Sequence, residues 1–214
     1  MLSARAGPHS GVKPINQREN TMIRSAIRKS LQVLALIFAV AAPLGSQAAE
    51  VRPVIKGGVD FGGETIATAT FSGGSTESIK ANEGAYVGGG VSIILDSKNV
   101  EIETTLSVKY TSITASNGDI TWTRYPLEVL AFYRMPKFRL GGGLTYHLSP
   151  KLKASGAAGN FNVNVDDALG LVLQADYLFT PKFSVGARYT ILEYKANGVP
   201  AKSDGVGITI GFIF

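Results

Sequence analysis

The fold is decided most clearly by residues 206–214, which read VGITIGFIF. The even positions, from Val206 to Phe214, are all apolar, whereas three of the four odd positions are Gly or Thr. Side chains that alternate with a period of two lie on opposite faces of a β-strand. The segment is therefore predicted to be a strand with one apolar face and one small or polar face.

The same alternation recurs after Ala49 in segments of about ten residues, the length that is typical of strands in membrane barrels. No stretch there sustains the 3.6-residue apolar period of a helix. The alternating segments number eight and cover residues 55–61, 87–95, 100–110, 124–133, 138–146, 169–179, 183–191 and 206–214. The pattern predicts an all-β chain that forms an eight-stranded antiparallel up-and-down transmembrane β-barrel.

The connections between these segments alternate in length. The short ones are residues 96–99, 135–137 and 180–182, and the long ones are residues 64–83, 112–119, 149–167 and 196–205. An even number of strands, with short turns on one side and longer loops on the other, is typical of outer-membrane barrels. Parts of the first and third long connections are expected to continue as strand beyond the bilayer.

A soluble β-sandwich is the alternative fold, since its strands also alternate apolar and polar residues. The polar face here is rich in Gly and in charges of both signs, which favours a barrel interior. Aromatic residues also gather near the short turns, where a membrane barrel carries an interfacial girdle. These aromatics are Tyr133, Phe138, Tyr177, Phe179, Phe183, Phe212 and Phe214.

The N-terminal segment predicts export. From Met22 a basic stretch is followed by an apolar run over residues 31–44 and by small residues before Ala49, the pattern of a secretory signal peptide. An uncleaved anchor is the alternative, but the run is shorter than the ~20 residues that span a bilayer. The expected parts are an upstream extension or misassigned start at 1–21, a cleaved signal peptide at 22–48, and the barrel domain at 49–214.

Composition excludes several kinds of chemistry. The chain has no Cys, so thiolate metal sites and cysteine nucleophiles are excluded, and its only histidines are His9 and His147. The formal charge of +5 belongs to the first 48 residues, because residues 49–214 carry 15 Lys and Arg against 15 Asp and Glu. We expect no nucleic-acid partner, since such binders need a basic surface.

The segment 51–214 resembles the small eight-stranded outer-membrane β-barrels grouped with the membrane domain of outer membrane protein A and the opacity proteins. The resemblance rests on the signal peptide, the strand and loop rhythm, Tyr125-Pro126-Leu127, Gly141-Gly142-Gly143 and the terminal Phe214. It implies a location in the outer membrane of a Gram-negative bacterium. Outer-membrane lipid and lipopolysaccharide are then the surroundings of the barrel.

The resemblance also implies a C-terminal assembly signal that contains Phe212 and Phe214. Barrel-assembly and periplasmic chaperone machinery would read this signal. Thr209 stands where the signal often has Gly, and Gly207 and Gly211 flank it.

The interior of an eight-stranded barrel is just wide enough to be filled by side chains. Buried charges are tolerated there when they are paired and hydrogen-bonded. The inward face is predicted to carry a lumen ionic network of ten residues, namely Lys56, Asp60, Glu101, Glu103, Lys109, Arg124, Glu128, Arg139, Asp176 and Arg188. The network would plug the barrel, either as a structural element or as a gate whose pairs exchange to open a narrow conduit.

Candidates for catalysis and metal binding are few. His147-Leu148-Ser149 is expected to place His and Ser on the same face of a strand end. It resembles the His-x-Ser of lipid A deacylase barrels, which pair a base with a nucleophile. Pro150 follows where that family has Asn, so no catalytic residue is expected. Residues 160–167 offer Asn and Asp oxygens but lack the Gly-anchored spacing of a calcium loop, which favours a strand. We expect neither a metal nor a cofactor.

These features predict a non-enzymatic, porin-like barrel that contributes to envelope integrity, or to surface interactions with an extracellular ligand through its loops. A narrow channel for small or apolar solutes is the main alternative, and a lipid A-modifying hydrolase is a weaker one. One faint repeat has no assigned role: PKFRLG at 136–141 and PKFSVG at 181–186 lie 45 residues apart.

Overall fold

The computed structural model describes residues 49–214 apart from 71–74, 96–98, 116–117 and 157–159. The expected upstream extension and signal peptide, residues 1–48, lie outside the described residues. Within the described part of the chain, no helix is long and apolar enough to cross a membrane. The strands are β1 (Glu50–Gly62), β2 (Thr65–Thr70), β3 (Thr76–Lys80), β4 (Gly84–Ile94), β5 (Val100–Ala115), β6 (Gly118–Arg134), β7 (Phe138–Gly156), β8 (Phe161–Asn164), β9 (Ala168–Thr180), β10 (Phe183–Ala196), β11 (Val199–Lys202) and β12 (Gly205–Ile213).

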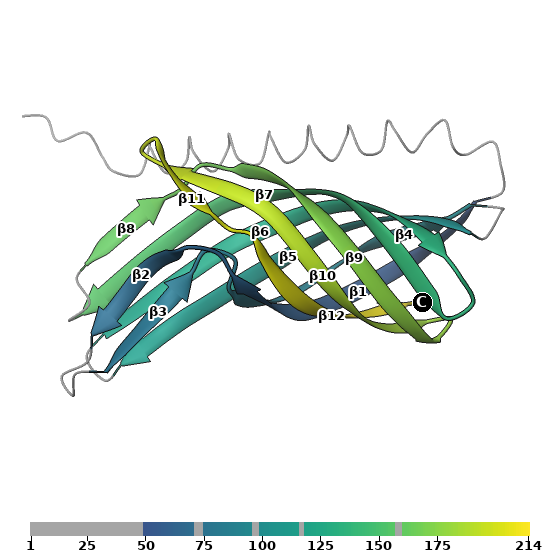
Figure 1. Cartoon of the computed structure of the whole chain (residues 1–214), viewed down its shortest axis with the longest axis horizontal. Helices are drawn as coiled ribbons and strands as arrows, with labels where there is room; N and C mark the ends of the chain where they lie inside the picture. The colour runs from purple at the N-terminus through teal and green to yellow at the C-terminus, as the bar shows by residue number, and fades with distance from the viewer. Residues whose placement is uncertain (1–48, 71–74, 96–98, 116–117, 157–159) are drawn as a thin grey trace, which may run out of the picture. The chain divides into compact units, whose positions relative to one another are not determined.

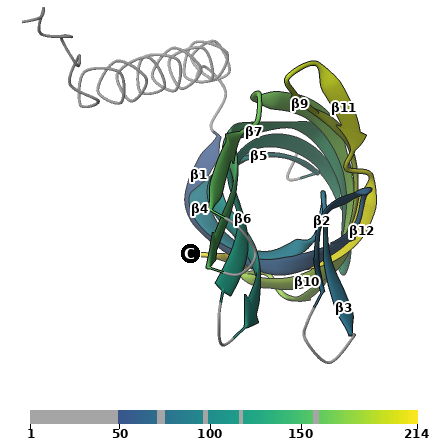
Figure 2. The same cartoon turned by 90° about the vertical axis from the view of Figure 1, so that its left-hand side faces the viewer.

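Eight of these strands pair in a closed antiparallel ring, in the order β1, β4, β5, β6, β7, β9, β10 and β12. The last strand returns to the first, with Val54 opposite Ile213 and Gly62 opposite Gly205. Figure 1 shows these strands from the side, and Figure 2 looks onto the end that carries β2 and β3. Closure removes the unpaired edges that an open sheet would expose. The predicted eight-stranded antiparallel barrel is confirmed.

The two ends of the ring differ. The ends of β4, β6 and β9 and the starts of β5, β7 and β10 lie together at one end, called here the turn end. The short strands β2, β3, β8 and β11 extend from the opposite end, called here the hairpin end (Figure 1). β2 pairs with β3, β8 with β7, and β11 with β10, so the predicted long connections contain much strand.

The connection expected at residues 112–119 is mostly strand. β5 continues to Ala115 and β6 begins at Gly118, with Ile113 opposite Ile120. These two isoleucines are 6% and 4% exposed, because they belong to an apolar cluster at the hairpin end. The strands extend past the expected loop because this cluster gives their apolar residues a place to pack.

The outward face of the ring is apolar and the inward face is polar. On β12, Ile208 and Ile210 are 53% and 43% exposed, whereas Thr209 between them is 3% exposed. This arrangement inverts that of a water-soluble protein and suits a ring surrounded by lipid.

A row of aromatic rings follows the turn end. Tyr177 lies between Phe138 and Phe179, with ring centroids 5.2 Å and 4.8 Å away. Phe183 extends the row between Phe179 and Phe212, at 5.6 Å and 4.7 Å. Aromatic rings are enriched where the bilayer meets water, so this row marks the level of one membrane interface.

The two Pro-Lys-Phe turns occupy equivalent positions at the turn end. The carbonyl oxygen of Lys137 accepts a hydrogen bond from the amide of Leu178 at 2.8 Å, and that of Lys182 accepts one from the amide of Ile213 at 2.8 Å. Each turn thus extends the backbone ladder onto the next strand of the ring. The faint sequence repeat corresponds to a repeated turn structure.

Candidate functional site

The ten residues expected in the lumen ionic network all lie in buried positions of the ring strands. Each of them is at most 6% exposed. They come from six strands: Lys56 and Asp60 from β1; Glu101, Glu103 and Lys109 from β5; Arg124 and Glu128 from β6; Arg139 from β7; Asp176 from β9; and Arg188 from β10. Inward alternation on neighbouring strands brings them to one interior.

Arg139 is the centre of the network near the turn end. Its Nη1 donates to Glu101 Oε1 at 2.6 Å and to Glu103 Oε2 at 2.9 Å, and its Nε donates to Asp176 Oδ2 at 2.6 Å. Arg134 forms a second ion pair with Glu101. Charge-assisted bonds of this kind are stronger than neutral ones, so these groups hold four strands of the ring together.

Lys56 connects this group to the middle of the lumen. Its Nζ lies 3.0 Å from Glu103 Oε1 and 3.2 Å from Glu128 Oε2. Glu128 also pairs with Arg188, whose Nε lies 3.8 Å from Asp60 Oδ1. Every group in this stretch thus touches a partner of opposite sign.

Lys109 ends the connected set toward the hairpin end, with its Nζ 2.5 Å from Asp60 Oδ2. The set contains five cations and five anions, which are Lys56, Lys109, Arg134, Arg139 and Arg188 against Asp60, Glu101, Glu103, Glu128 and Asp176. An isolated ion in a low-dielectric interior loses its solvation without compensation. A connected set with equal numbers of cations and anions offsets part of that cost.

Glycine on adjacent strands makes room for two carboxylates of the network. Asp176 lies against Gly186, and Asp60 lies against Gly207. A Cβ at either glycine would collide with the carboxylate beside it. The glycines of the inward face are therefore part of how the charged groups are accommodated.

Arg124 is buried but stands outside the connected set. Its Nη2 donates to the carbonyl oxygen of Glu83 at 2.5 Å, and its guanidinium carbon lies 5.1 Å from the centre of the Trp122 ring. Among the described residues no carboxylate forms an ion pair with it, and Glu128 pairs with Lys56 and Arg188 instead. Arg124 is thus held by a backbone carbonyl and an aromatic face.

Three lumen side chains hold three consecutive residues of the connection between β3 and β4. Trp122 Nε1 donates to the carbonyl oxygen of Ala81 at 3.0 Å, Lys109 Nζ donates to Asn82 Oδ1 at 3.0 Å, and Arg124 binds Glu83 as described above. Ala81 and Asn82 are fully buried. Residues 81–83, called here the stopper, therefore enter the hairpin end of the lumen.

An apolar cluster surrounds the stopper. It contains Ala81 of the stopper itself, and its other buried members come from β3, β5, β6, β7, β9 and β10: Ile79, Ile113, Ile120, Trp122, Ala154, Ala168, Leu192 and Tyr194. Buried apolar area contributes roughly 25 cal/mol per Å² to stability. The hairpin end is thus closed by a small hydrophobic core in addition to the hydrogen bonds of the stopper.

His147 and Ser149 lie in different surroundings. His147 is 2% exposed and its Nδ1 is hydrogen-bonded to the hydroxyl of Tyr194. Ser149 is exposed, has a φ of 47°, and donates its amide to Asp167 Oδ1 at 2.8 Å. The expectation that the two side chains share a strand face is wrong, because the register shifts here and reverses the alternation of β7.

One cavity inside the ring is too small to hold more than about one water molecule. This cavity, which Lys109, His147 and Arg188 help to line, measures about 10 Å³, and roughly 10–15 Å³ is needed for one water molecule. Among the described residues, no group of three or more metal-ligating side chains could hold a metal ion.

Sequence reasoning missed Arg134 and the stopper. Arg134 shares the inward parity of Arg124 and Glu128 on β6, so the alternation could have placed it in the network. The stopper has no comparable signal, because its three lumen partners lie 27 to 41 residues away in the chain.

Comparison with known proteins identifies similar barrels. The model of the outer membrane protein beta-barrel domain family matches residues 33–214. No curated protein matches the chain. One similar structure is that of Ail, the attachment invasion locus protein of Yersinia pestis, in complex with the heparin analogue sucrose octasulfate. Its TM-score is 0.52 and its sequence identity is 12%, and the match covers 78% of this chain and 99% of that chain. Neisserial surface protein A has a TM-score of 0.43 and 12% identity over 78% and 100%.

The network predicts a specific energetic coupling. Glu128→Gln and Arg188→Gln are each expected to lower the free energy of unfolding by about 3–5 kcal/mol, because each leaves a buried charge without its partner. The double variant is expected to cost less than the sum, with a coupling energy of about 1–3 kcal/mol. Urea unfolding of the barrel in lipid vesicles measures all three.

The matched control pairs Glu128→Gln with Arg124→Gln, which share a strand but no ion pair. This second cycle is expected to be additive within roughly 0.5 kcal/mol. Equal coupling energies in the two cycles would contradict the pairing described above.

Proposed function

The chain belongs to the outer membrane protein beta-barrel domain family, and from this premise we propose that it is a sealed, non-enzymatic barrel of the Gram-negative outer membrane. Its ring would act as a rigid anchor, contributing to envelope integrity and presenting the hairpin end to partners. We also propose that residues 22–48 are removed as a signal peptide, that residues 1–21 are not part of the mature protein, and that residues 49–214 form the working domain.

The observation that carries this proposal is the connected, neutral set of five cations and five anions in the lumen. A conduit for solutes would require these pairs to separate and take up water. Separating one buried pair leaves two charges without compensation, which costs several kcal/mol. The stopper and its apolar cluster add a second closure, so an open channel has no support from the lumen geometry.

The hairpin end supports a role at the cell surface. Outer-membrane barrels have short periplasmic turns and longer extracellular loops, so the hairpin end would be extracellular. Exposed lysines there include Lys153 on β7 and Lys195 on β10, while Lys202 lies on β11. Cations at this level suit the phosphates of lipopolysaccharide. The hairpins themselves offer variable surface to an extracellular ligand, as loops on rigid scaffolds commonly do.

The C-terminal strand supports the proposed assembly partners. Phe212 and Phe214 are 48% and 59% exposed. Barrel-assembly and periplasmic chaperone machinery could therefore read these rings before the strand pairs with β1. After insertion the same rings would lie at the membrane interface with the aromatic row.

Electrical recording tests the sealed state. Protein purified from outer membranes and reconstituted in planar bilayers is expected to give no single-channel steps, because the lumen charges remain paired. A general porin inserted in the same way is the positive control, and heat-dependent gel mobility verifies that the barrel is folded. Reproducible conductance steps from the wild-type protein would instead support the narrow channel.

Lipid A composition tests the absence of catalysis. Mass spectrometry of lipid A is expected to give the same acyl pattern in cells with the gene, cells without it, and cells carrying His147→Ala. The reason is that His147 is buried against Tyr194 while Ser149 is turned away from it. An acyl chain that is missing in wild-type cells and returns in the His147→Ala strain would show a hydrolase and refute the proposal.

A further inference from the structure

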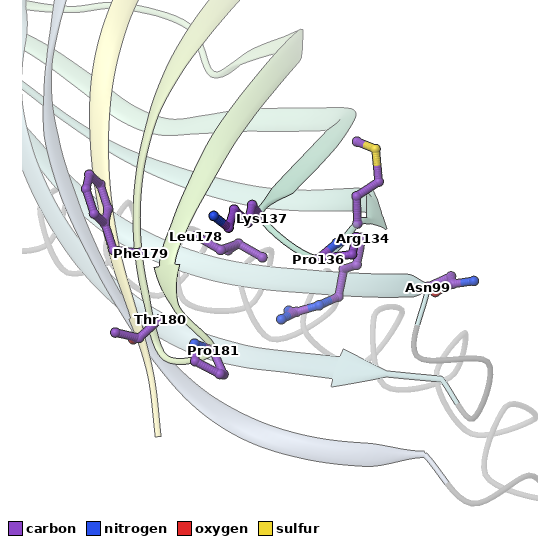
Figure 3. A pocket seen from close by; sticks show the side chains of 9 residues that line it. Asn99, Arg134, Pro136, Lys137, Leu178, Phe179, Thr180 and Pro181 are labelled. Atoms are coloured by element: carbon purple, nitrogen blue, oxygen red, sulfur yellow. The ribbon is translucent and has the colours of Figure 1, made fainter.

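An open pocket of about 490 Å³ lies at the turn end, between three short connections of the ring. Figure 3 shows the side chains around it. They are Asn99, Arg134, Met135, Pro136, Lys137, Leu178, Phe179, Thr180 and Pro181. Two of these residues are basic and none is acidic, so the described lining is cationic.

The positive charge of this pocket is only partly compensated. Arg134 is paired with Glu101 through Nη1 and is 13% exposed, whereas a guanidinium carries five donor hydrogens in all. Glu101 is shared with Arg139, at 2.6 Å. The connected set has equal numbers of cations and anions with Arg134 included, so the exposed Lys137 adds a positive charge that no described lining residue balances.

Besides the two basic residues and the polar Asn99 and Thr180, the lining is apolar, and two prolines stiffen it. Pro136 and Pro181 fix the two turns, and Leu178 and Phe179 lie between them. Phe179 also belongs to the aromatic row, with its ring centroid 4.8 Å from that of Tyr177. Because this row marks the membrane interface, the pocket lies at the level of lipid headgroups and offers both a cationic and an apolar wall.

We propose that this pocket binds the phosphate of an anionic phospholipid from the periplasmic leaflet. The phosphate would lie against Arg134 and Lys137, and the glycerol and upper acyl chain would lie along Phe179. Basic pockets on membrane proteins recognise lipid headgroups through the same combination of charge and interfacial depth. Free phosphate shares the headgroup chemistry but has no apolar part, so the apolar wall favours the lipid.

The repeated turn supplies a matched control. Lys182 occupies the position in its Pro-Lys-Phe turn that Lys137 occupies in the other, and both side chains are exposed. Only Lys137 of the two lines the pocket. General attraction of an anionic membrane surface to lysine would act on both residues equally, whereas a built site would depend on Lys137.

The experiment measures lipid binding to the protein purified from outer membranes in mild detergent and delipidated. Native mass spectrometry follows the binding of phosphatidylglycerol and of zwitterionic phosphatidylcholine to wild type, Lys137→Gln and Lys182→Gln. Wild type is expected to bind one phosphatidylglycerol in preference to phosphatidylcholine. Lys137→Gln is expected to weaken that binding about fivefold, the effect of removing one basic residue near a membrane surface, while Lys182→Gln leaves it unchanged.

A parallel titration with inorganic phosphate separates the two sources of the anion. If millimolar phosphate competes with phosphatidylglycerol for wild type and this competition is lost in Lys137→Gln, the site is retained but assigned to a free anion. Absence of competition would support the lipid. Equal losses in the two lysine variants, or no preference of wild type for phosphatidylglycerol, would overturn the proposal. Unchanged heat-dependent gel mobility of both variants verifies that each is folded.

Discussion

The structure depends on the requirement that charges inside the ring find partners, because burial removes them from bulk water. Arg139 meets three carboxylates within 2.9 Å, from Glu101, Glu103 and Asp176. Pairings of this kind join strands that are not neighbours in the ring. The need for pairing therefore keeps the charged residues on the inner face. The residues that alternate with them then form the outer face, which contacts lipid.

Other features follow from that constraint. Positions 186 and 207 require glycine, because a carboxylate of the network occupies the space that a Cβ would need at Gly186 and at Gly207. Arg124, which has no carboxylate partner among the described residues, binds the backbone of Glu83 and thereby helps to hold the stopper. Arg124, which stands outside the connected set, thus contributes to closing the hairpin end. The proposed sealed lumen would leave the two ends of the ring as the places where recognition occurs.

The sequence was sufficient for the ring and for the inward position of its charges, because alternation with a period of two reports directly on the two faces of a strand. It was not sufficient to predict which charged residues form ion pairs with each other. Alternation places Arg124 and Glu128 on the same face of β6, but it does not show that Glu128 pairs with Arg188 from another strand. The register shift at Ser149 and the insertion of the stopper also escaped prediction, because both depend on contacts between distant segments.

The central claim is that the lumen charges are paired as described when the barrel lies in a membrane. Solid-state NMR of the labelled protein in lipid vesicles measures it directly, through dipolar couplings between guanidinium nitrogens and carboxylate carbons. The account predicts strong coupling between Arg188 and the Glu128 carboxylate, and no carboxylate coupling for Arg124. Coupling of Arg124 to Glu128, or rapid exchange of the Arg188 guanidinium protons with bulk water, would contradict it.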